Sequence, residues 1–213
     1  MTSLTHIFVD LDGPLLDGRR RHYFCYQTIL RKFACTPLEI DQYWNQKRTG
    51  GDRHTLLKLS GAEGIYAAYL GLWLSLIESP EALAFDSVQE GAIARLTDWK
   101  KAGYSLNVVT MRKNGQALGH QLETLGLRPL LDSVVLCKHE DGGEGKAHAA
   151  KRLFPSLDFA GSALWIGDTE VDSDAAAALN CRLILASNGL RDEVFLRSRC
   201  NTMVVPSIAG LKL

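Results

Sequence analysis

The sequence predicts an α/β protein: a Rossmann-like core built on a parallel sheet, with a small helical cap inserted after strand 1. Two observations carry this prediction. From residue 86 onward, short apolar runs that end in turn or acidic residues alternate with amphipathic stretches, which is typical of αβ units with helices on both sheet faces. Between residues 17 and 85, only helical patterns occur. We therefore expect residues 1–16 and 86–213 to form the core and residues 17–85 the cap.

Composition and charge argue against several functional classes. The chain of 213 residues is 46% hydrophobic and 23% charged, which fits a globular protein of one domain with an insertion or of two small domains. Lys plus Arg equals Asp plus Glu at 24 each, so no overall field favours nucleic acid or an anionic membrane. The five cysteines are scattered, and no apolar run is long enough to span a bilayer. We expect a cytoplasmic monomer or small homo-oligomer without nucleic-acid or membrane partners.

The first strand is predicted at the apolar run Ile7–Val9, which ends in two carboxylates, Asp10 and Asp12. Gly13 and Pro14 then interrupt the pattern. A short apolar run bounded by turn residues is typical of a buried parallel strand. The two acids should therefore lie at the carboxyl end of that strand, where open parallel sheets bind ligands.

The insertion is expected to be helical because its apolar residues recur at three- and four-residue intervals. Thr36 and Pro37 resemble a cap followed by proline at the first helical position, and Asp52 can cap a short helix. No strand is predicted in this segment. The predicted helices span residues 19–34, 38–48, 52–58 and 63–78.

The remaining chain alternates between helix and strand. Gly103 stands where glycine often ends a helix, and the glycine-rich residues 141–145 are expected to form a flexible loop. The predicted helices span residues 86–101, 116–125, 146–154, 172–179 and 192–199. The predicted strands span residues 104–109, 133–136, 163–166, 182–185 and 203–205.

Residues that can carry chemistry follow separate predicted strands, whose carboxyl ends should meet at one edge of the sheet. They are Asp10, Asp12, Thr110, Lys146, Asp168 and Asp172. Neighbouring carboxylates raise the free energy of ionising one another, and a hard cation such as Mg²⁺ would remove that cost. A metal and a lysine can also offset charge on transferring phosphoryl oxygens. This set of residues therefore predicts Mg²⁺-dependent phosphoryl transfer.

Each residue type has a part to play in such a reaction. A strand-end carboxylate can attack phosphorus and form an aspartyl phosphate. A second carboxylate, two residues on, can protonate the leaving oxygen and then deprotonate water. Thr110 lies just before a predicted helix, so its hydroxyl and nearby N–H groups can receive a phosphate. Lys146 is the favoured lysine, with Lys138 and Lys151 as alternatives.

The order of these residues resembles the four motifs of the haloacid dehalogenase-like hydrolase superfamily. Asp10-Leu11-Asp12-Gly13 resembles the nucleophile motif, and Val108-Val109-Thr110 resembles the second motif. Lys146 resembles the lysine of the third motif, and the run from Gly167 to Asp172 resembles the acidic metal motif. With a helical insertion after strand 1, the resemblance is to phosphoglycolate phosphatase and β-phosphoglucomutase-like proteins.

The resemblance implies a phosphatase that acts on a small phosphorylated metabolite with Mg²⁺ as cofactor. It implies Asp10 as nucleophile and metal ligand, and Asp12 as acid and base that also offers its backbone carbonyl to the metal. It further implies Asp168 as a direct ligand, and Asp172 as a ligand or a residue that supports one.

Substrate contacts are predicted on both sides of the insertion boundary. His22 stands where related mutases and phosphatases carry histidine, and residues 47–53 resemble the specificity loop of the cap, in which Arg53 can meet an oxyanion. Arg112 lies two residues beyond Thr110 and can face the same site. The predicted substrate-binding residues are Thr110, Met111, Arg112, Arg53 and His22.

Other functions stay open on this pattern. His22 and the Arg53 loop also fit a sugar phosphomutase, which must keep water away from its aspartyl phosphate. Pro14 stands where the family usually has Thr or Val; it removes an N–H and fixes φ, which would also suit a non-catalytic binding or regulatory module. A dehalogenase or a phosphonatase is disfavoured because neither has a use for Asp12 as acid.

Overall fold

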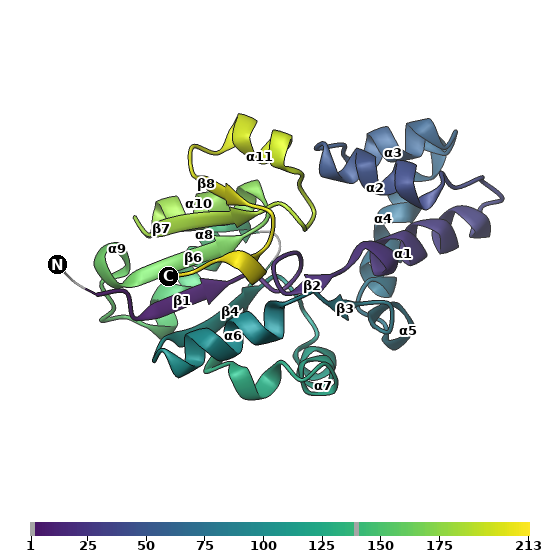
Figure 1. The fold of residues 1–213 in the computed structure, drawn as a ribbon. Helices are drawn as coiled ribbons and strands as arrows, with labels where there is room; N and C mark the ends of the chain where they lie inside the picture. Colours follow the sequence, from purple (N-terminus) through teal and green to yellow (C-terminus); the bar gives the residue numbers. More distant parts are fainter. Residues whose placement is uncertain (1–2, 139–140) are drawn as a thin grey trace. The chain divides into compact units, whose positions relative to one another are not determined.

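The computed structural model describes residues 3–138 and 141–213. The chain divides into two compact units, one formed by Met1–Asp17 with Val88–Leu213 and the other by Gly18–Ser87. We call them the α/β unit and the helical unit, and Figure 1 shows the elements of each. None of the helices in the described ranges is long and apolar enough to cross a membrane.

The α/β unit is built on a six-stranded sheet in which all neighbouring strands are parallel. This confirms the predicted fold class. In spatial order the strands are β5 (Ser133–Leu136), β4 (Ser105–Thr110), β1 (His6–Val9), β6 (Ala163–Gly167), β7 (Arg182–Ala186) and β8 (Met203–Val205). The strand that carries the first acidic motif, β1, therefore lies between the strands that lead to Thr110 and Asp168.

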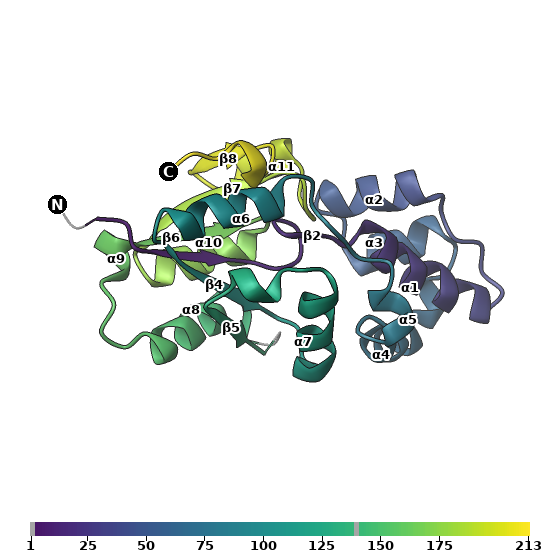
Figure 2. The same cartoon turned by 60° about the horizontal axis from the view of Figure 1, so that its bottom comes forward.

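Helices cover both faces of the sheet (Figures 1 and 2). Successive side chains of β1 point to opposite faces of the sheet, as in any strand. Ile7 and Val9 belong to a core that also contains side chains of α6 (Ala92–Lys101) and α7 (Gly115–Thr124). Phe8 belongs to the opposite core, with side chains of α8, α9 and α10. These helices span Gly142–Leu153, Phe159–Ser162 and Glu170–Ala178. All three β1 side chains are completely buried, as expected for a central parallel strand.

The last helix covers the far edge of the sheet. Leu196 of α11 (Glu193–Arg199) packs with Leu185 of β7 and Val204 of β8. Asp192 caps this helix by accepting a hydrogen bond from the Phe195 N–H at 2.7 Å.

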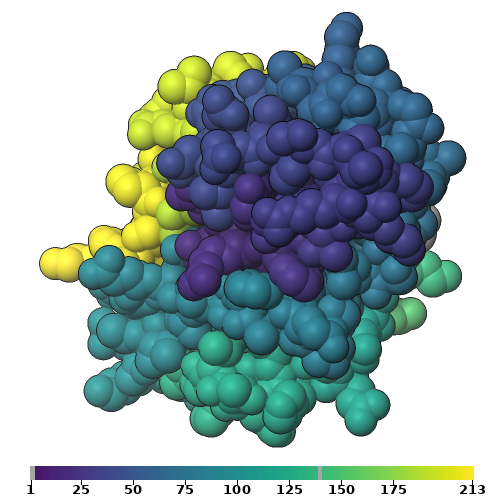
Figure 3. Space-filling view, turned by 90° about the vertical axis from the view of Figure 1, so that its right-hand side faces the viewer, coloured from purple at the N-terminus to yellow at the C-terminus, as the bar shows by residue number. Residues whose placement is uncertain are grey.

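The helical unit contains α1 (Arg19–Lys32), α2 (Ile40–Arg48), α3 (Arg53–Leu59), α4 (Tyr66–Leu76) and α5 (Pro80–Leu83), with a short 3₁₀ turn at Glu63–Ile65. One face of this unit appears in purple to blue in Figure 3. The rings of Tyr26 and Tyr43 stack at 4.5 Å between centroids, and a buried ion pair joins Arg21 to Asp86 at 2.8 Å. Asp52 caps α3 as predicted, by accepting from the Thr55 N–H.

One helix predicted at the boundary of the insertion starts later than expected. Residues 86–91 do not begin a helix, because Gly91 adopts a left-handed φ of +74° that ends any helical continuity, and α6 starts at Ala92. The chain instead forms two-residue strands, β2 (Leu16–Asp17) and β3 (Ser87–Val88), which pair with each other.

Two predicted helix starts were also wrong. α2 begins at Ile40 and not after Pro37, because the backbone of Leu38 bonds to the hydroxyls of Tyr23 and Tyr26 in α1. α8 begins at Gly142, within the stretch predicted as a loop. A Cβ at Gly143 would lie 2.5 Å from the Val171 carbonyl oxygen, so the glycine there allows α8 and α10 to pack closely.

Candidate active site

The predicted catalytic residues of the core meet at the carboxyl edge of the sheet. Because β1 pairs in parallel with both β4 and β6, the residues that follow these strands emerge side by side. Asp10 follows β1, Thr110 ends β4 and Asp168 follows β6. Lys146 and Asp172 reach the same place from α8 and α10.

Asp10 is a buried carboxylate with a lysine partner. Its side chain accepts from the Leu11 N–H at 2.8 Å and lies 2.8 Å from the Lys146 ammonium. Burial raises the pKa of Asp10 to about 7, with the charge of Asp172 adding to the rise and Lys146 opposing it. Burial therefore disfavours the charged form of Asp10, and the Lys146 ammonium favours it.

Lys146 stabilises that charge from the N-terminal half of α8. Its ammonium nitrogen lies 2.8 Å from Asp10 Oδ2 and 2.8 Å from Asp172 Oδ1, and the side chain is 2% exposed. Burial alone would lower the pKa of Lys146, but the two carboxylates raise it above its ordinary value. The lysine is therefore cationic and serves two acids. Its rivals from sequence, Lys138 and Lys151, are exposed.

Asp172 is fixed at the first turn of α10. Its Oδ1 accepts from the Trp165 indole N–H at 3.3 Å, and its Oδ2 accepts from the backbone N–H groups of Asp168 and Thr169 at 3.2 Å and from the Thr169 hydroxyl at 2.9 Å. Together with Lys146, these donors occupy both oxygens. Asp172 thus caps its helix and anchors the lysine at once.

Asp168 supplies the evidence that this cluster suits a cation. Its Oδ2 accepts from the Leu190 N–H at 2.5 Å, but its buried Oδ1 finds no hydrogen-bond partner among the described residues. Oxygens of Asp10, Asp168 and Asp172 lie within 4.8 Å of one another. Burial and the charges of the other two acids raise the pKa of Asp168. A set of oxygen donors with one buried oxygen left over fits Mg²⁺.

Two glycines make room for this carboxylate. A Cβ at Gly13, whose φ is +104°, would lie 2.2 Å from Asp168 Cγ, and one at Gly189 would lie 2.1 Å from Asp168 Oδ2. Both loops must therefore approach Asp168 with bare backbone. Gln89 contacts both loops, since its side-chain amide donates to the Gly13 carbonyl at 2.9 Å and to the Asn188 carbonyl at 3.5 Å.

Asp12 and Arg112 form a two-pronged ion pair beside the cluster. Arg112 Nε lies 2.7 Å from Asp12 Oδ2, and Nη2 lies 2.8 Å from Asp12 Oδ1. Arg112 is 4% exposed, whereas the Asp12 side chain is one-third exposed. The structure thus places Arg112 at the site, in contact with the predicted acid and base.

The other predicted residues of this unit occupy the end of β4. Thr110 is buried, and its hydroxyl oxygen accepts from the Arg112 N–H at 3.4 Å. Met111 is half-buried in the loop that follows. Asn114 then caps α7 through the Ala117 N–H at 3.0 Å, so a helix N-terminus follows Thr110 as predicted.

In the helical unit, His22 and Arg53 meet on one aromatic side chain. The ring of His22 lies 5.5 Å from that of Trp73, and the Arg53 guanidinium lies 5.9 Å from the same ring centroid. Lys47, the first residue of the run that resembles the specificity loop, contributes its ammonium at 5.7 Å. This unit therefore gathers cationic groups around Trp73.

Several residues of the site were missed from sequence. Trp165 gave no signal, because it reads as one more apolar residue of a buried strand. Gly189 and Leu190 could have been placed near the site, because the turn residues Ser187 and Asn188 follow a predicted strand and indicate a loop at the same sheet edge.

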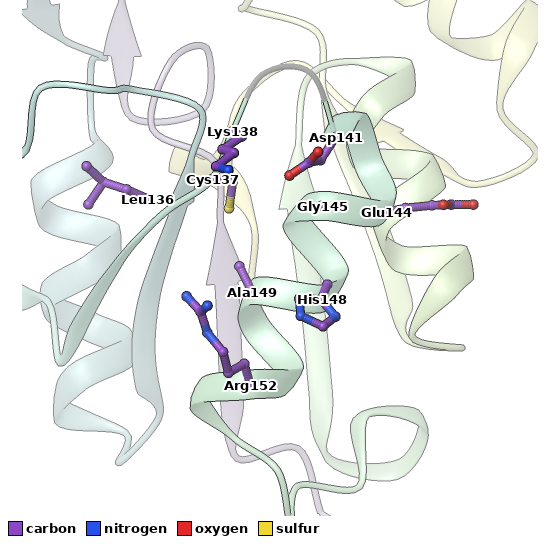
Figure 4. Close-up of a pocket in the computed structure, with 9 residues that line it drawn as sticks. All are labelled: Leu136, Cys137, Lys138, Asp141, Glu144, Gly145, His148, Ala149 and Arg152. Atoms are coloured by element: carbon purple, nitrogen blue, oxygen red, sulfur yellow. The ribbon is translucent and has the colours of Figure 1, made fainter.

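A separate cavity of about 650 Å³ lies between the end of β5 and α8 (Figure 4). Its lining includes two basic side chains, Lys138 and Arg152, and two acidic ones, Asp141 and Glu144. None of the carboxylates of the acidic cluster lines it, within the part of the chain that the structure describes. The cavity is therefore distinct from the site built at the ends of β1, β4 and β6.

Comparison with protein families shows where this chain belongs. The model of the haloacid dehalogenase-like hydrolase family matches residues 4–180. The chain is therefore a member of the haloacid dehalogenase-like hydrolase family, as the four motifs predicted. No curated protein matches the chain significantly.

Solved structures share the fold at low sequence identity. A haloacid dehalogenase-like hydrolase from Streptococcus pneumoniae superposes with a TM-score of 0.76 at 16% identity, covering 94% of this chain and 93% of its own. A predicted phosphoglycolate phosphatase from Haemophilus somnus gives 0.72 at 16% identity, covering 98% and 96%. Protein Tyrosine Kinase A of Mycobacterium tuberculosis gives 0.76 at 21% identity, covering 98% and 99%. These likenesses show the fold alone.

Proposed function

We propose that this hydrolase is a Mg²⁺-dependent phosphatase that cleaves the phosphomonoester of a small metabolite through an aspartyl phosphate. The observation that carries the proposal is the buried arrangement of Asp10, Lys146 and Asp168 at one sheet edge. Phosphatase-named proteins among the structures with this fold agree with it. Other activities are also named among them, so the site and not the fold is the basis of the proposal.

The proposed reaction has two halves. The Asp10 carboxylate forms a bond to phosphorus while the bond to the ester oxygen breaks, and Asp12 gives that oxygen a proton. In the second half, Asp12 takes a proton from water, whose oxygen bonds to phosphorus while the bond to Asp10 breaks and inorganic phosphate leaves. Thr110 and the N–H groups near it hold the phosphoryl oxygens, and Lys146 offsets their charge.

The acidic cluster would hold the metal. We assign Asp10 and Asp168 as side-chain ligands and the Asp12 carbonyl as a backbone ligand. Asp172 completes the acidic set and orients Lys146, since its oxygens already accept five hydrogen bonds. When bound, Mg²⁺ would supply positive charge against the phosphoryl oxygens and offset the mutual repulsion of the acids.

The test is a panel of metabolite phosphates and an aryl phosphate, scored by released phosphate with Mg²⁺. We expect turnover of at least one of them, silencing by EDTA, and recovery when Mg²⁺ is restored. A panel without any turnover in the presence of Mg²⁺ would contradict the proposal and favour a non-catalytic module.

Mg²⁺ should stabilise the protein more at pH 8 than at pH 5. The folded-state pKa of Asp10, about 7, lies above its ordinary value of 3.8. Between these values the folded protein holds more protons than the unfolded chain, so stability without metal falls as pH rises through this window. Mg²⁺ competes with those protons. The measurement is the gain in Tm on adding Mg²⁺ at each pH. The exposed acid variant Asp98→Asn is the control and should show the same gains as wild type. Equal gains at pH 5 and pH 8 in the wild-type protein would refute the prediction.

A sugar phosphomutase is the second candidate, favoured by His22 and Arg53 around Trp73. Lys47 and Arg53 are cations that can bind a phosphate group of a sugar phosphate. Isomer formation without release of phosphate would decide for the mutase. Release of phosphate without isomerisation would decide for the phosphatase.

A further inference from the structure

The ion pair between Asp12 and Arg112 joins two loops of the site. The pairing of β1 with β4 ends at Val9 and Val108. Beyond that point, the fork of Arg112 connects the loop after β4 to the loop after β1. The same loop after β1 carries Asp10, so this contact lies within a few residues of the proposed reacting centre.

The geometry of the pair is specific to arginine. Two donors of one planar guanidinium reach the two oxygens of one carboxylate at 2.7 and 2.8 Å. Such a fork fixes the plane of the carboxylate as well as its position, which a lysine ammonium cannot do. Because Arg112 is 4% exposed, its own conformation is held by the surrounding protein. The guanidinium is thus a rigid support for a partly exposed carboxylate.

The contact also defines how Asp12 is presented. Both of its oxygens accept hydrogen bonds from Arg112, so Asp12 stands here as an acceptor, which is the form of a base. A carboxylate oxygen has two lone pairs, so one hydrogen bond from an arginine does not by itself prevent it from taking a proton from water. Arg112 Nε and Nη2, in contrast, are already engaged before a substrate arrives. This arrangement suits support of Asp12 better than direct capture of a substrate anion.

We propose that Arg112 is a positioning residue that orients Asp12 as the base of the second half-reaction. This inference rests on the proposed function. With Arg112 in place, Asp12 takes a proton from water, the water oxygen bonds to phosphorus, and the electron pair of the breaking bond returns to Asp10. Without the fork, Asp12 samples other orientations, and hydrolysis of the aspartyl phosphate slows while its formation from an aryl phosphate does not.

The experiment is rapid-mixing kinetics with p-nitrophenyl phosphate and Mg²⁺, for which the leaving group needs no acid. Arg112→Ala should release nitrophenol in a burst equal to the enzyme concentration, followed by steady turnover roughly 100-fold slower than wild type. The KM should fall together with kcat, leaving kcat/KM unchanged. Arg112→Lys keeps the charge without the fork and should behave in the same way; it also replaces the alanine variant should that one fail to fold.

A double-mutant cycle tests whether Arg112 acts through Asp12. Asp12→Asn should show the same burst, and Arg112→Ala added to it should slow turnover by less than about twofold. If the losses in turnover of the two single variants multiply in the double variant, the proposal is overturned. A raised KM with unchanged kcat in Arg112→Ala would also overturn it, since that would make Arg112 a substrate contact. Arg95→Lys is the matched control, because Arg95 also donates through Nε and Nη2, here to the Ala209 carbonyl. A burst in that variant would overturn the proposal.

A readout without turnover separates this inference from the proposed function. The ¹⁵N resonance of Arg112 Nε–H, assigned by its loss in Arg112→Lys, should move in Asp12→Asn and stay in place in Asp98→Asn. An unmoved signal would refute the contact. If the signal moves in Asp12→Asn but the wild-type protein turns over no phosphomonoester, the contact is supported and the proposed function is refuted. The catalytic part of this inference would then fail with the proposed function.

Discussion

Asp10→Asn should lower kcat for an aryl phosphate by roughly 10⁴-fold or more, because the amide cannot attack phosphorus to form the covalent intermediate. The carboxylate concerned is buried and held 2.8 Å from Lys146. The measurement is phosphate release at saturating substrate and Mg²⁺. Wild-type kcat in this variant would refute the aspartyl-phosphate route.

The same substitution should leave the fold intact. Burial disfavours the charged form of Asp10, as its raised pKa shows, and Lys146 keeps Asp172 as a partner at 2.8 Å. Without metal we therefore expect a Tm no lower than that of wild type. Asp98→Asn, at an acid whose side chain is 60% exposed, controls for the chemical change and should keep both its activity and its Tm.

Lys146→Met should be the most destabilising substitution at the site. It leaves Asp10 and Asp172 buried without their shared cation, and removing one partner of a buried ion pair costs about 3–5 kcal/mol. The measurement is the free energy of unfolding in urea at pH 7 with EDTA. Lys146 lowers the pKa of Asp10, so its removal should raise that pKa further above the wild-type value of about 7. The loss should therefore be larger at pH 9 than at pH 7, because at pH 7 protonation of Asp10 already removes part of the uncompensated charge.

Lys151→Met is the matched control for this experiment. Lys151 lies on the same helix, α8, but is exposed, so its substitution should change the free energy of unfolding by less than about 0.5 kcal/mol. Equal losses in the two variants would show that the buried ammonium of Lys146 has no special role in stability. Added Mg²⁺ should restore more stability to Lys146→Met than to wild type, because a bound cation would replace the missing charge.

The parallel core was predictable because its signals are local. Short apolar runs ending in acids place Asp10 and Asp168 at strand ends. Parallel pairing of these two strands then brings their carboxyl ends together. Lys146 could be placed by its spacing to the last acids. The start of α8 could not, because glycine at 143 signals a loop locally but serves helix packing in the fold.

The contacts between side chains were beyond reach of the sequence. Arg112 was predicted to face the site, but nothing in the chain indicates that its fork closes on Asp12, a hundred residues away. The same holds for Trp165, whose indole N–H supports Asp172 from within an apolar strand. Such contacts depend on which rotamers the packed core permits, and a pattern of residue types does not encode them.

The lysine shared by two acids has a consequence for folding. Asp10 follows β1, whereas Lys146 lies in α8 and Asp172 in α10, so the three residues meet only when these segments pack together. Closing such loops is entropically costly, and the two ion pairs of Lys146 are both present only when all three segments have come together. We therefore expect no catalytic activity from a fragment that ends before α10.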